Sequence, residues 1–222
     1  GVVLAAGKGE RARQYKQFTM VGGQLLCCYA MNNMTDSGVF HEIIEVTPRV
    51  CGLPLNDNHR RIIGGPTRIE SLYNGVMACE GDYVIFTDAA RPYTPPWVFS
   101  KIANILQRNN AVVVVQPEYD SIIKARDRDW DACFHDGVLD DYRQSWENYP
   151  RDFIRRIQTP NGFKTAILID ILEDMIDKNK TNDSAISEYI RRFGKPAFLT
   201  DEFFNDKVTT AADLRHAKVY FS

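Results

Sequence analysis

The sequence predicts an α/β fold in which helices cover both faces of a mostly parallel β-sheet. Short apolar runs rich in β-branched residues alternate with longer segments whose apolar residues recur at helical spacing. Such runs are typical of strands buried on both faces, and Ala111–Val115 is the clearest of them. The alternation favours parallel pairing, because each helix carries the chain back over the sheet before the next strand begins.

The first half of the chain supplies the larger share of these elements. Strands are expected in the apolar run before Gly7 and at 43–47, 60–63 and 83–87. Helices are expected at 25–31 behind the Gly22-Gly23 turn, after Pro66, and from Pro95-Pro96 onward. Pro48 ends the second of the strands, because proline cannot continue a hydrogen-bonded ladder.

The second half is less regular. After the strand at 111–115, the segment from about 119 to 152 is polar, acidic and aromatic, with no clear period. Helical spacing returns from Phe163 to Met175, and again from Ala185 to Ile190 before Gly194, which is a suitable helix stop. The chain closes with a predicted short strand at 205–209 that leads into a helix capped by Thr210.

The segment 119–152 is interpreted as an arm-like excursion within a single domain that spans 1–222. Disordered segments are poor in aromatic residues, but this one contains Trp130, Trp146 and several tyrosines. We therefore expect it to pack on another surface, such as a second subunit.

Composition limits the classes of partner. The chain has 222 residues, 44% of them hydrophobic, which is enough for a substantial core. Its net charge of −2 provides no general basic field for a nucleic acid or an anionic membrane surface. No apolar run has the length of a membrane span, so a soluble, cytoplasmic protein is expected. The five cysteines lack metal-ligand or disulfide spacing and are expected to be reduced thiols.

The first strand opens into a loop that has the chemistry of an anion site. Gly7 and Gly9 let backbone N–H groups approach a ligand, and Arg11 and Lys16 follow within the same loop. A triphosphate fits such a set of donors and cations. The alternative is an ordinary turn between strand and helix, with both cations solvated.

Asp88 follows the apolar run of the strand at 83–87. Ligands of open α/β sheets collect at the carboxyl ends of strands, so this carboxylate is a candidate for a metal or substrate contact. The alternative is a turn cap, which is a common role of aspartate.

Five separated motifs occur in one order along the chain, and together they resemble the cytidylyltransferases of the methylerythritol phosphate and ribitol phosphate type. The resemblance covers nearly the whole chain. The motifs are Leu4-Ala5-Ala6-Gly7-x-Gly9-x-Arg11 with Lys16-Gln17-Phe18, Gly64-Gly65-x-x-Arg68-x-x-Ser71-x-x-Asn74-Gly75, Asp88-Ala89-Ala90-Arg91-Pro92, Gln158-Thr159-Pro160 and Asn205-x-Lys207-Val208-Thr209.

This resemblance implies a Rossmann-like nucleotidyltransferase (GT-A-like) fold with a projecting dimerisation arm. Enzymes of this type join CTP to a small alcohol phosphate and release diphosphate, with Mg²⁺ as the divalent cation. They are usually homodimers with shared active sites, in which each arm completes the site of the partner subunit.

The resemblance also implies roles for individual residues on the CTP side. The residues expected to border the nucleotide are Ala5, Ala6, Gly7 and Gly9. Those expected to contact its phosphates are Arg11, Lys16 and Lys207. Gly65 and Ser71 are expected to contact the cytosine, Asp88 to lie beside the metal, and Arg91 to support that turn.

Two further residues are implied on the acceptor side. The arm threonine of the family corresponds to Ser121, and its arm arginine corresponds to Arg151, eight residues before Thr159. Both are expected to reach the alcohol phosphate in the partner subunit.

The chain departs from the family pattern at several positions. Thr87 stands where a histidine is usual, Asn161 replaces a glutamine, and Ile123 occupies a position that is lysine in methylerythritol phosphate enzymes. The loop between Arg11 and Lys16 is shorter than usual, and the segment between Ser121 and Arg151 is longer. The acceptor therefore stays open between methylerythritol phosphate, ribitol phosphate and another phosphate.

Two other functions compete with the transferase. A dinucleotide-dependent oxidoreductase would also place Gly-x-Gly after a strand, but Arg11-Ala12 stands where its third glycine is required. A decayed transferase that survives as a nucleotide-binding partner is the second alternative. Retention of Arg11, Lys16, Asp88 and Lys207 favours an active enzyme.

Overall fold

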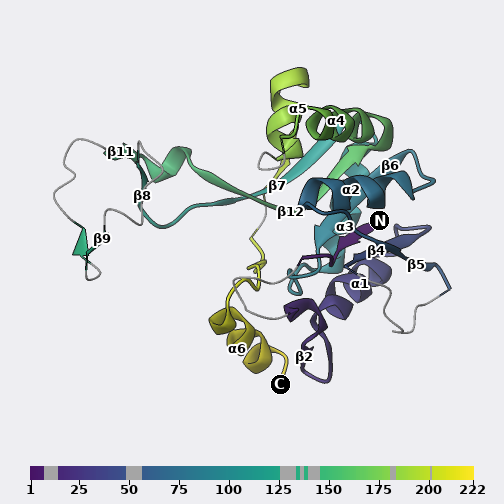
Figure 1. Ribbon diagram of the computed structural model, residues 1–222, viewed down its shortest axis with the longest axis horizontal. Coiled ribbons are helices and arrows are strands. Elements are labelled where there is room, and N and C mark those ends of the chain that lie inside the picture. The colour runs from purple at the N-terminus through teal and green to yellow at the C-terminus, as the bar shows by residue number, and fades with distance from the viewer. Residues whose placement is uncertain are drawn as a thin grey trace. The chain divides into compact units, whose positions relative to one another are not determined.

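The computed structural model describes residues 1–7, 15–48, 57–125, 134–135, 138–139, 146–180, 184–200 and 202–222. Residue contacts divide the chain into two compact units. The first comprises Gly1–Val114 and Gln158–Ser222, and the second comprises Val115–Ile157. The elements of both units are labelled in Figure 1.

Among the described residues, a seven-stranded sheet lies mainly in the first unit. Its strands are β1 (Val2–Leu4), β4 (Ile43–Thr47), β5 (His59–Ile63), β6 (Tyr83–Asp88), β7 (Ala111–Pro117), β12 (Arg155–Lys164) and β13 (Ala197–Leu199). Their spatial order is β13-β7-β12-β6-β1-β4-β5. The ends of β7 and β12 belong to the second unit. The pairs of β1 with β4 and β6, of β4 with β5 and of β7 with β13 are parallel, whereas β12 runs antiparallel to β6. The predicted mostly parallel sheet is confirmed.

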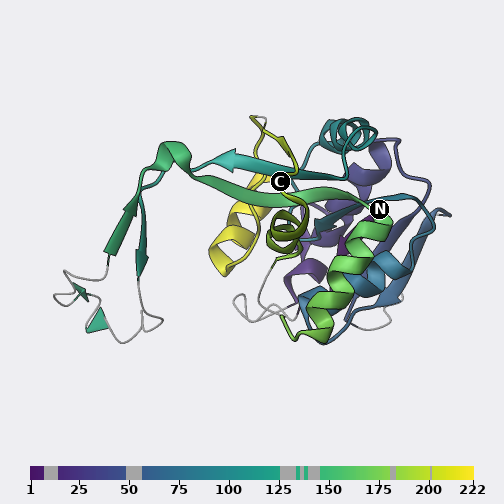
Figure 2. The same cartoon turned by 90° about the horizontal axis from the view of Figure 1, so that it is seen from above.

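Helices lie on both faces of this sheet, as predicted (Figures 1 and 2). The helices of the described chain are α1 (Leu26–Asp36), α2 (Arg68–Met77), α3 (Pro96–Leu106), α4 (Thr165–Asp177), α5 (Ala185–Phe193) and α6 (Ala211–Tyr220), of which α6 shares a buried cluster with Val21 and with Leu26 of α1. Helices α1 and α3 contact each other on one face, and α2 and α4 contact each other on the other. Helix α2 begins with a capping box in which Thr67 and Glu70 bond reciprocally, so the backbone of its first residue, Arg68, is fixed.

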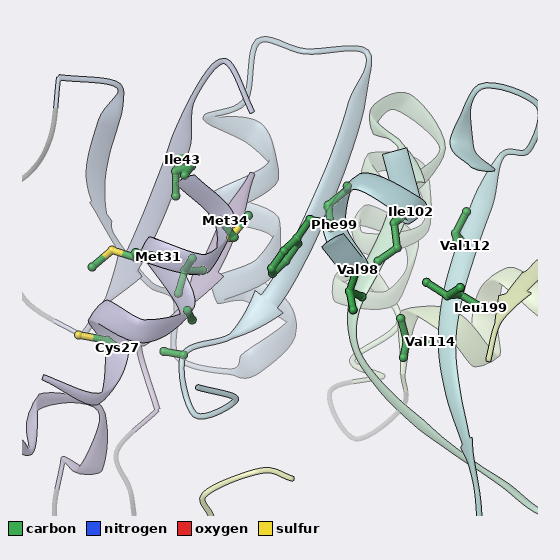
Figure 3. Packing of buried hydrophobic residues seen from close by; sticks show 14 of the residues in the cluster. Cys27, Met31, Met34, Ile43, Val98, Phe99, Ile102, Val112, Val114 and Leu199 are labelled. Carbon is green, nitrogen blue, oxygen red and sulfur yellow. The ribbon is translucent and has the colours of Figure 1, made fainter. Parts of the chain in front are cut away.

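The core fills the space between the helices and the sheet. On the α1 and α3 face, one buried cluster extends from Met34 and Phe99 to strand residues such as Val112 and Val114 (Figure 3). On the opposite face, Phe86 of β6 stacks on Phe163 of β12 with ring centroids 6.0 Å apart. These side chains are almost fully buried, which is where most of the hydrophobic stabilisation arises.

A small hairpin lies between the first strand and α1. It joins β2 (Met20–Val21) to β3 (Gln24–Leu25), and the 3₁₀ helix η2 (Lys16–Phe18) precedes it. Gly22 and Gly23 have φ of 51° and 85°, so the predicted Gly-Gly turn is confirmed. Both angles lie in the left-handed region that glycine adopts at low cost.

The second unit contains the segment predicted as an arm, 119–152. Strand β8 (Ile122–Ala125) pairs antiparallel with β11 (Trp146–Tyr149), and β9 (Phe134–His135) pairs with β10 (Val138–Leu139). A 3₁₀ helix, η4 (Arg151–Phe153), follows β11. The sequence predicted no regular elements in this segment.

Three other details differ from the prediction. The strand predicted at 205–209 is wrong, because these residues form an irregular segment in which the Val208 N–H donates to the carbonyl of Ala90 at 2.8 Å. Phe163, predicted in a helix, lies in β12, and α4 begins at Thr165. Strands β12 and β13 were not predicted, because β12 mixes charged residues with proline and glycine and β13 has three residues.

Candidate active site

The carboxyl ends of the central parallel strands meet at one edge of the sheet. Register pairs Leu4 of β1 with Asp88 of β6 and with Val46 of β4, so the turns that follow these strands are neighbours. The chain leaves β1 on one side through β4 and β5 and then returns to β6 on its other side. Such a switch point is where open α/β sheets bind ligands.

The turn after β1 is held by a buried side chain. Gln17 of η2 donates from Nε2 to the carbonyls of Ala5 at 2.7 Å and Gly7 at 2.8 Å. The same short helix carries Lys16, whose Nζ lies 3.4 Å from the carbonyl of Thr209. Gln17 therefore ties the turn to the element that bears the predicted phosphate-binding lysine.

Asp88 ends β6 and is buried among cations. Its Oδ1 accepts from Arg68 Nη2 at 3.1 Å, and its Oδ2 accepts from Lys207 Nζ at 2.7 Å. Arg91 Nε lies 4.0 Å from Oδ2. Burial alone would raise the pKa of this carboxyl, but Arg68, Lys207 and Arg91 outweigh it and hold the pKa well below its usual range. The carboxylate is therefore ionised at neutral pH.

The segment that carries Lys207 is fixed by Asn205. The Asn205 amide donates to Gln158 Oε1 at 2.8 Å and to the carbonyl of Thr159 at 2.9 Å, and its Oδ1 accepts from Thr94 at 2.6 Å. The carbonyl of Asn205 also accepts from Arg91 Nη1 at 2.5 Å. These buried bonds join the predicted motifs at 88–92, 158–160 and 205–209 into one support for Lys207.

The start of α2 forms another wall of the site. Ser71 Oγ lies 2.8 Å from the carbonyl of Thr67 and 3.2 Å from that of Gly65. A Cβ on Gly64 would meet Ala6 Cβ at 2.5 Å, so this wall and the turn after β1 are in close contact. Glycine is required at this position because nothing larger fits between them.

A cavity of about 550 Å³ lies between these walls. Its described lining comes from the turn after β1, η2, the start of α2, the end of β6 and Lys207. This volume falls in the range of small-molecule sites. The described lining residues include no histidine or cysteine, so the chemistry available is that of cations, one carboxylate, the hydroxyls of Tyr15, Thr67 and Ser71, the Gln17 amide and backbone groups.

The predicted site residues are largely brought together. Those that line the cavity are Ala5, Ala6, Gly7, Lys16, Gly65, Ser71, Asp88 and Lys207. Arg91 is buried behind the turn, where it contacts Asn205 and Asp88. Gly9 and Arg11 lie outside the described residues. Ser121 and Arg151 belong to the second unit, where Arg151 Nη1 donates to the carbonyl of Tyr119 at 3.1 Å.

Sequence reasoning gave no role to Arg68 and Gln17, although both stand inside its motifs. For Arg68 the available signal was its position at the start of a capped helix that follows two glycines. The departures at Thr87 and Asn161 are buried within β6 and β12, where Asn161 Oδ1 accepts from the Val114 N–H at 3.0 Å. Both departures from the family pattern therefore lie in the sheet.

Two features are absent from the described part of the chain. No helix there is long and apolar enough to cross a membrane. No group of three or more His, Cys, Asp or Glu side chains there is placed to hold a metal ion.

Comparisons with known proteins agree with the resemblance. The family model of 2-C-methyl-D-erythritol 4-phosphate cytidylyltransferase matches residues 1–222. The chain is 29% identical to the protein of that name from Thermotoga neapolitana, over 98% of this chain and 94% of the relative. It is 30% identical to a bifunctional IspD/IspF enzyme from Anaeromyxobacter sp., of which it spans 55%.

The fold is also shared with solved structures. The crystal structure of the 2-C-methyl-D-erythritol 4-phosphate cytidylyltransferase from Thermus thermophilus superposes with a TM-score of 0.78, and the match covers 99% of this chain and 97% of that one. Sequence identity is 23%, so this likeness speaks for the fold.

Proposed function

The chain belongs to the 2-C-methyl-D-erythritol 4-phosphate cytidylyltransferase family, and we propose that it joins CTP to 2-C-methyl-D-erythritol 4-phosphate. Members of this family are CTP-dependent nucleotidyltransferases acting on a sugar-alcohol phosphate, so the oxidoreductase alternative is set aside. The acceptor is the part of the proposal that goes beyond family membership.

The family model supports the acceptor. The observation that carries the nucleotidyl transfer itself is the charge around Asp88. One buried carboxylate is in contact with Arg68 and Lys207, has Arg91 close by, and shares its cavity with Lys16. This excess of cations suits a triphosphate and a second phosphate that must approach it. In phosphoryl and nucleotidyl transfer, positioning and charge stabilisation supply most of the catalysis.

The proposed reaction needs no general base. The second pKa of a phosphomonoester is about 6, so the acceptor phosphate is largely a dianion at neutral pH. Its oxygen attacks the α-phosphorus of CTP in line, and the bond from that phosphorus to the diphosphate breaks. Lys16 and Lys207 are proposed to stabilise the charge that moves onto the diphosphate, because both lie in the cavity.

Mg²⁺ fits this site as an ion that arrives with the nucleotide. It is usually bound through one or two carboxylates together with substrate phosphates, and Asp88 offers one ionised carboxylate in the cavity. Asp88 is therefore proposed as the protein ligand. When bound, the ion would supply further neutralisation of phosphate charge.

The second unit is proposed to make the protein a homodimer. A two-stranded ribbon such as β8 with β11 is marginally stable by itself. Apolar side chains in the same unit are exposed, and Phe153 retains 85% of its accessible surface. We propose that this unit packs on a second copy of the chain, where Ser121 and Arg151 contact the acceptor phosphate.

The test is an assay of purified protein with CTP, Mg²⁺ and a panel of alcohol phosphates. We expect diphosphate and a CDP-alcohol to form with 2-C-methyl-D-erythritol 4-phosphate in preference to ribitol 5-phosphate. Preference for another phosphate would overturn the acceptor and leave the transferase intact. Binding of CTP without diphosphate release from any acceptor would favour a decayed, nucleotide-binding protein.

A further inference from the structure

The two oxygens of Asp88 differ in how firmly their cations are held. Oδ2 accepts from Lys207, whose segment is anchored by the Val208 bond to Ala90 and by the buried Asn205. Oδ1 accepts from Arg68, whose side chain is 47% exposed, compared with 33% for Lys207. Among the described residues, Asp88 is the group that the Arg68 guanidinium contacts.

This arrangement is unfavourable for a free metal ion. Arg68, Lys207 and Arg91 outnumber the single carboxylate, so a divalent cation that enters alone meets a net positive site. Mg²⁺ binds oxygen ligands at about 2.0–2.1 Å. The Arg68 guanidinium already lies against Oδ1, so its positive charge would repel a metal ion at that oxygen. A nucleotide triphosphate removes both obstacles, because it adds negative charge and offers Arg68 other oxygens.

We propose that Arg68 is an internal counter-ion of Asp88 that makes metal binding conditional on nucleotide. In the structure the Arg68 guanidinium donates to Oδ1. When a nucleotide enters, Arg68 moves onto the phosphates and releases Oδ1 to the metal ion. The inference rests on the proposed function, because it takes Asp88 to be the metal ligand and CTP to be the nucleotide.

The experiment measures Mn²⁺ binding to the whole protein without nucleotide, from the electron paramagnetic resonance signal of the free ion. Arg68→Gln removes the counter-ion, and we expect it to bind Mn²⁺ about tenfold more tightly than the wild type, because one neighbouring charge is worth at least that factor. Adding Asp88→Asn to Arg68→Gln should remove the gain. When CTP is added, the wild type should take up more Mn²⁺ than CTP alone removes in a sample without protein.

Arg60→Gln is the matched control. The Arg60 side chain is 49% exposed and pairs with Glu42 at 2.6 Å on another part of the surface, so its loss should leave Mn²⁺ affinity unchanged. Arg68→Lys keeps the positive charge and should also keep the wild-type affinity. Equal Mn²⁺ affinity for Arg68→Gln, Arg68→Lys and the wild type without CTP would overturn the proposal. Failure of the proposed function would appear separately, as a wild-type protein that does not turn over CTP.

Discussion

Individual side chains at the edge of the sheet divide into those that line the cavity and those that hold other residues in place. Lys16, Asp88 and Lys207 line the cavity directly. Gln17, Arg91 and Asn205 are buried and donate to backbone carbonyls of neighbouring segments, Gln17 to Ala5, Arg91 to Asn205 and Asn205 to Thr159. Buried polar groups persist when their bonds are satisfied, so this second set fixes the geometry that the first set uses.

Lys16→Ala is expected to lower turnover about 10²-fold or more while changing CTP affinity less. The reason is that leaving-group charge develops mainly in the transition state, where the lost ammonium would act. Steady-state rates and CTP binding by calorimetry measure the two effects separately. Lys101→Ala, which removes a lysine over Trp97 on α3, is the control and should keep full activity. Near-normal turnover by Lys16→Ala would count heavily against the site.

The pH dependence of kcat/KM should reflect the ionisation of the acceptor phosphate and not that of Asp88. The pKa of Asp88 is held below its usual range, so the carboxylate gains its proton only in strong acid and stays charged between about pH 5 and 8. The phosphate of the acceptor has a second pKa of about 6, so kcat/KM should fall as pH drops through that value. A phosphonate acceptor with a higher second pKa should shift this acidic limb of the kcat/KM profile to higher pH. A limb that stays in place with the phosphonate would point to a protein group instead.

At the scale of elements, α2 links the core to the cavity. Its first turn supplies Arg68 and Ser71, and its buried face rests on β1 and β4. Gly75 lies at that contact, where an added Cβ would meet Val2 Cγ1 at 2.7 Å and Val46 Cγ2 at 2.9 Å. Valine side chains in strands are stiff at χ1, so they cannot yield easily. The distance between helix and sheet is therefore set by this glycine.

Gly75→Ala is expected to destabilise the protein, although alanine favours a helix by about 1 kcal/mol over glycine. Overpacking costs about 1–3 kcal/mol, so the free energy of unfolding should fall by up to about 2 kcal/mol. Thermal unfolding should show a melting temperature lower by a few degrees. Met77→Ala, at a half-exposed position of the same helix, should change it less. An unchanged or raised melting temperature would mean that the helix rests less tightly on the sheet.

At the scale of the whole molecule, the two compact units carry different parts of the proposed site. The first unit contains the cavity and its cations, and the second contains Ser121 and Arg151. In a symmetric dimer, an interface residue of each copy contacts the other copy. If the second unit acts across such an interface, catalysis belongs to the pair of chains and not to one chain.

A mixing experiment tests this sharing. Lys16→Ala and Arg151→Ala should each be nearly inactive as pure proteins. After the two are unfolded together and refolded, half of the dimers should be mixed, and each mixed dimer should contain one intact site, which restores roughly a quarter of wild-type activity. Lys16→Ala mixed with Lys207→Ala is the control and should restore none, because both changes lie in the same unit. No recovery in the first mixture would exclude sites shared in this way.

The sequence predicts the order of the main elements, because local periodicity and turn residues indicate where a strand or helix lies. The parallel strands before Gly7 and at 43–47, 60–63, 83–87 and 111–115 were all confirmed. The short strands of the second unit and β12 were not predicted, because their residues alternate too little to be distinguished from loops.

The sequence by itself determined the fold class and the set of candidate residues, since the motifs are short and each is local. Only the tertiary structure decided that Arg68 contacts Asp88, 20 residues away, and that Lys207 reaches the same carboxylate from 119 residues away. The physical reason is that such contacts follow from strand order and register, which bring distant turns to one edge of the sheet. Neither is stated by any local pattern.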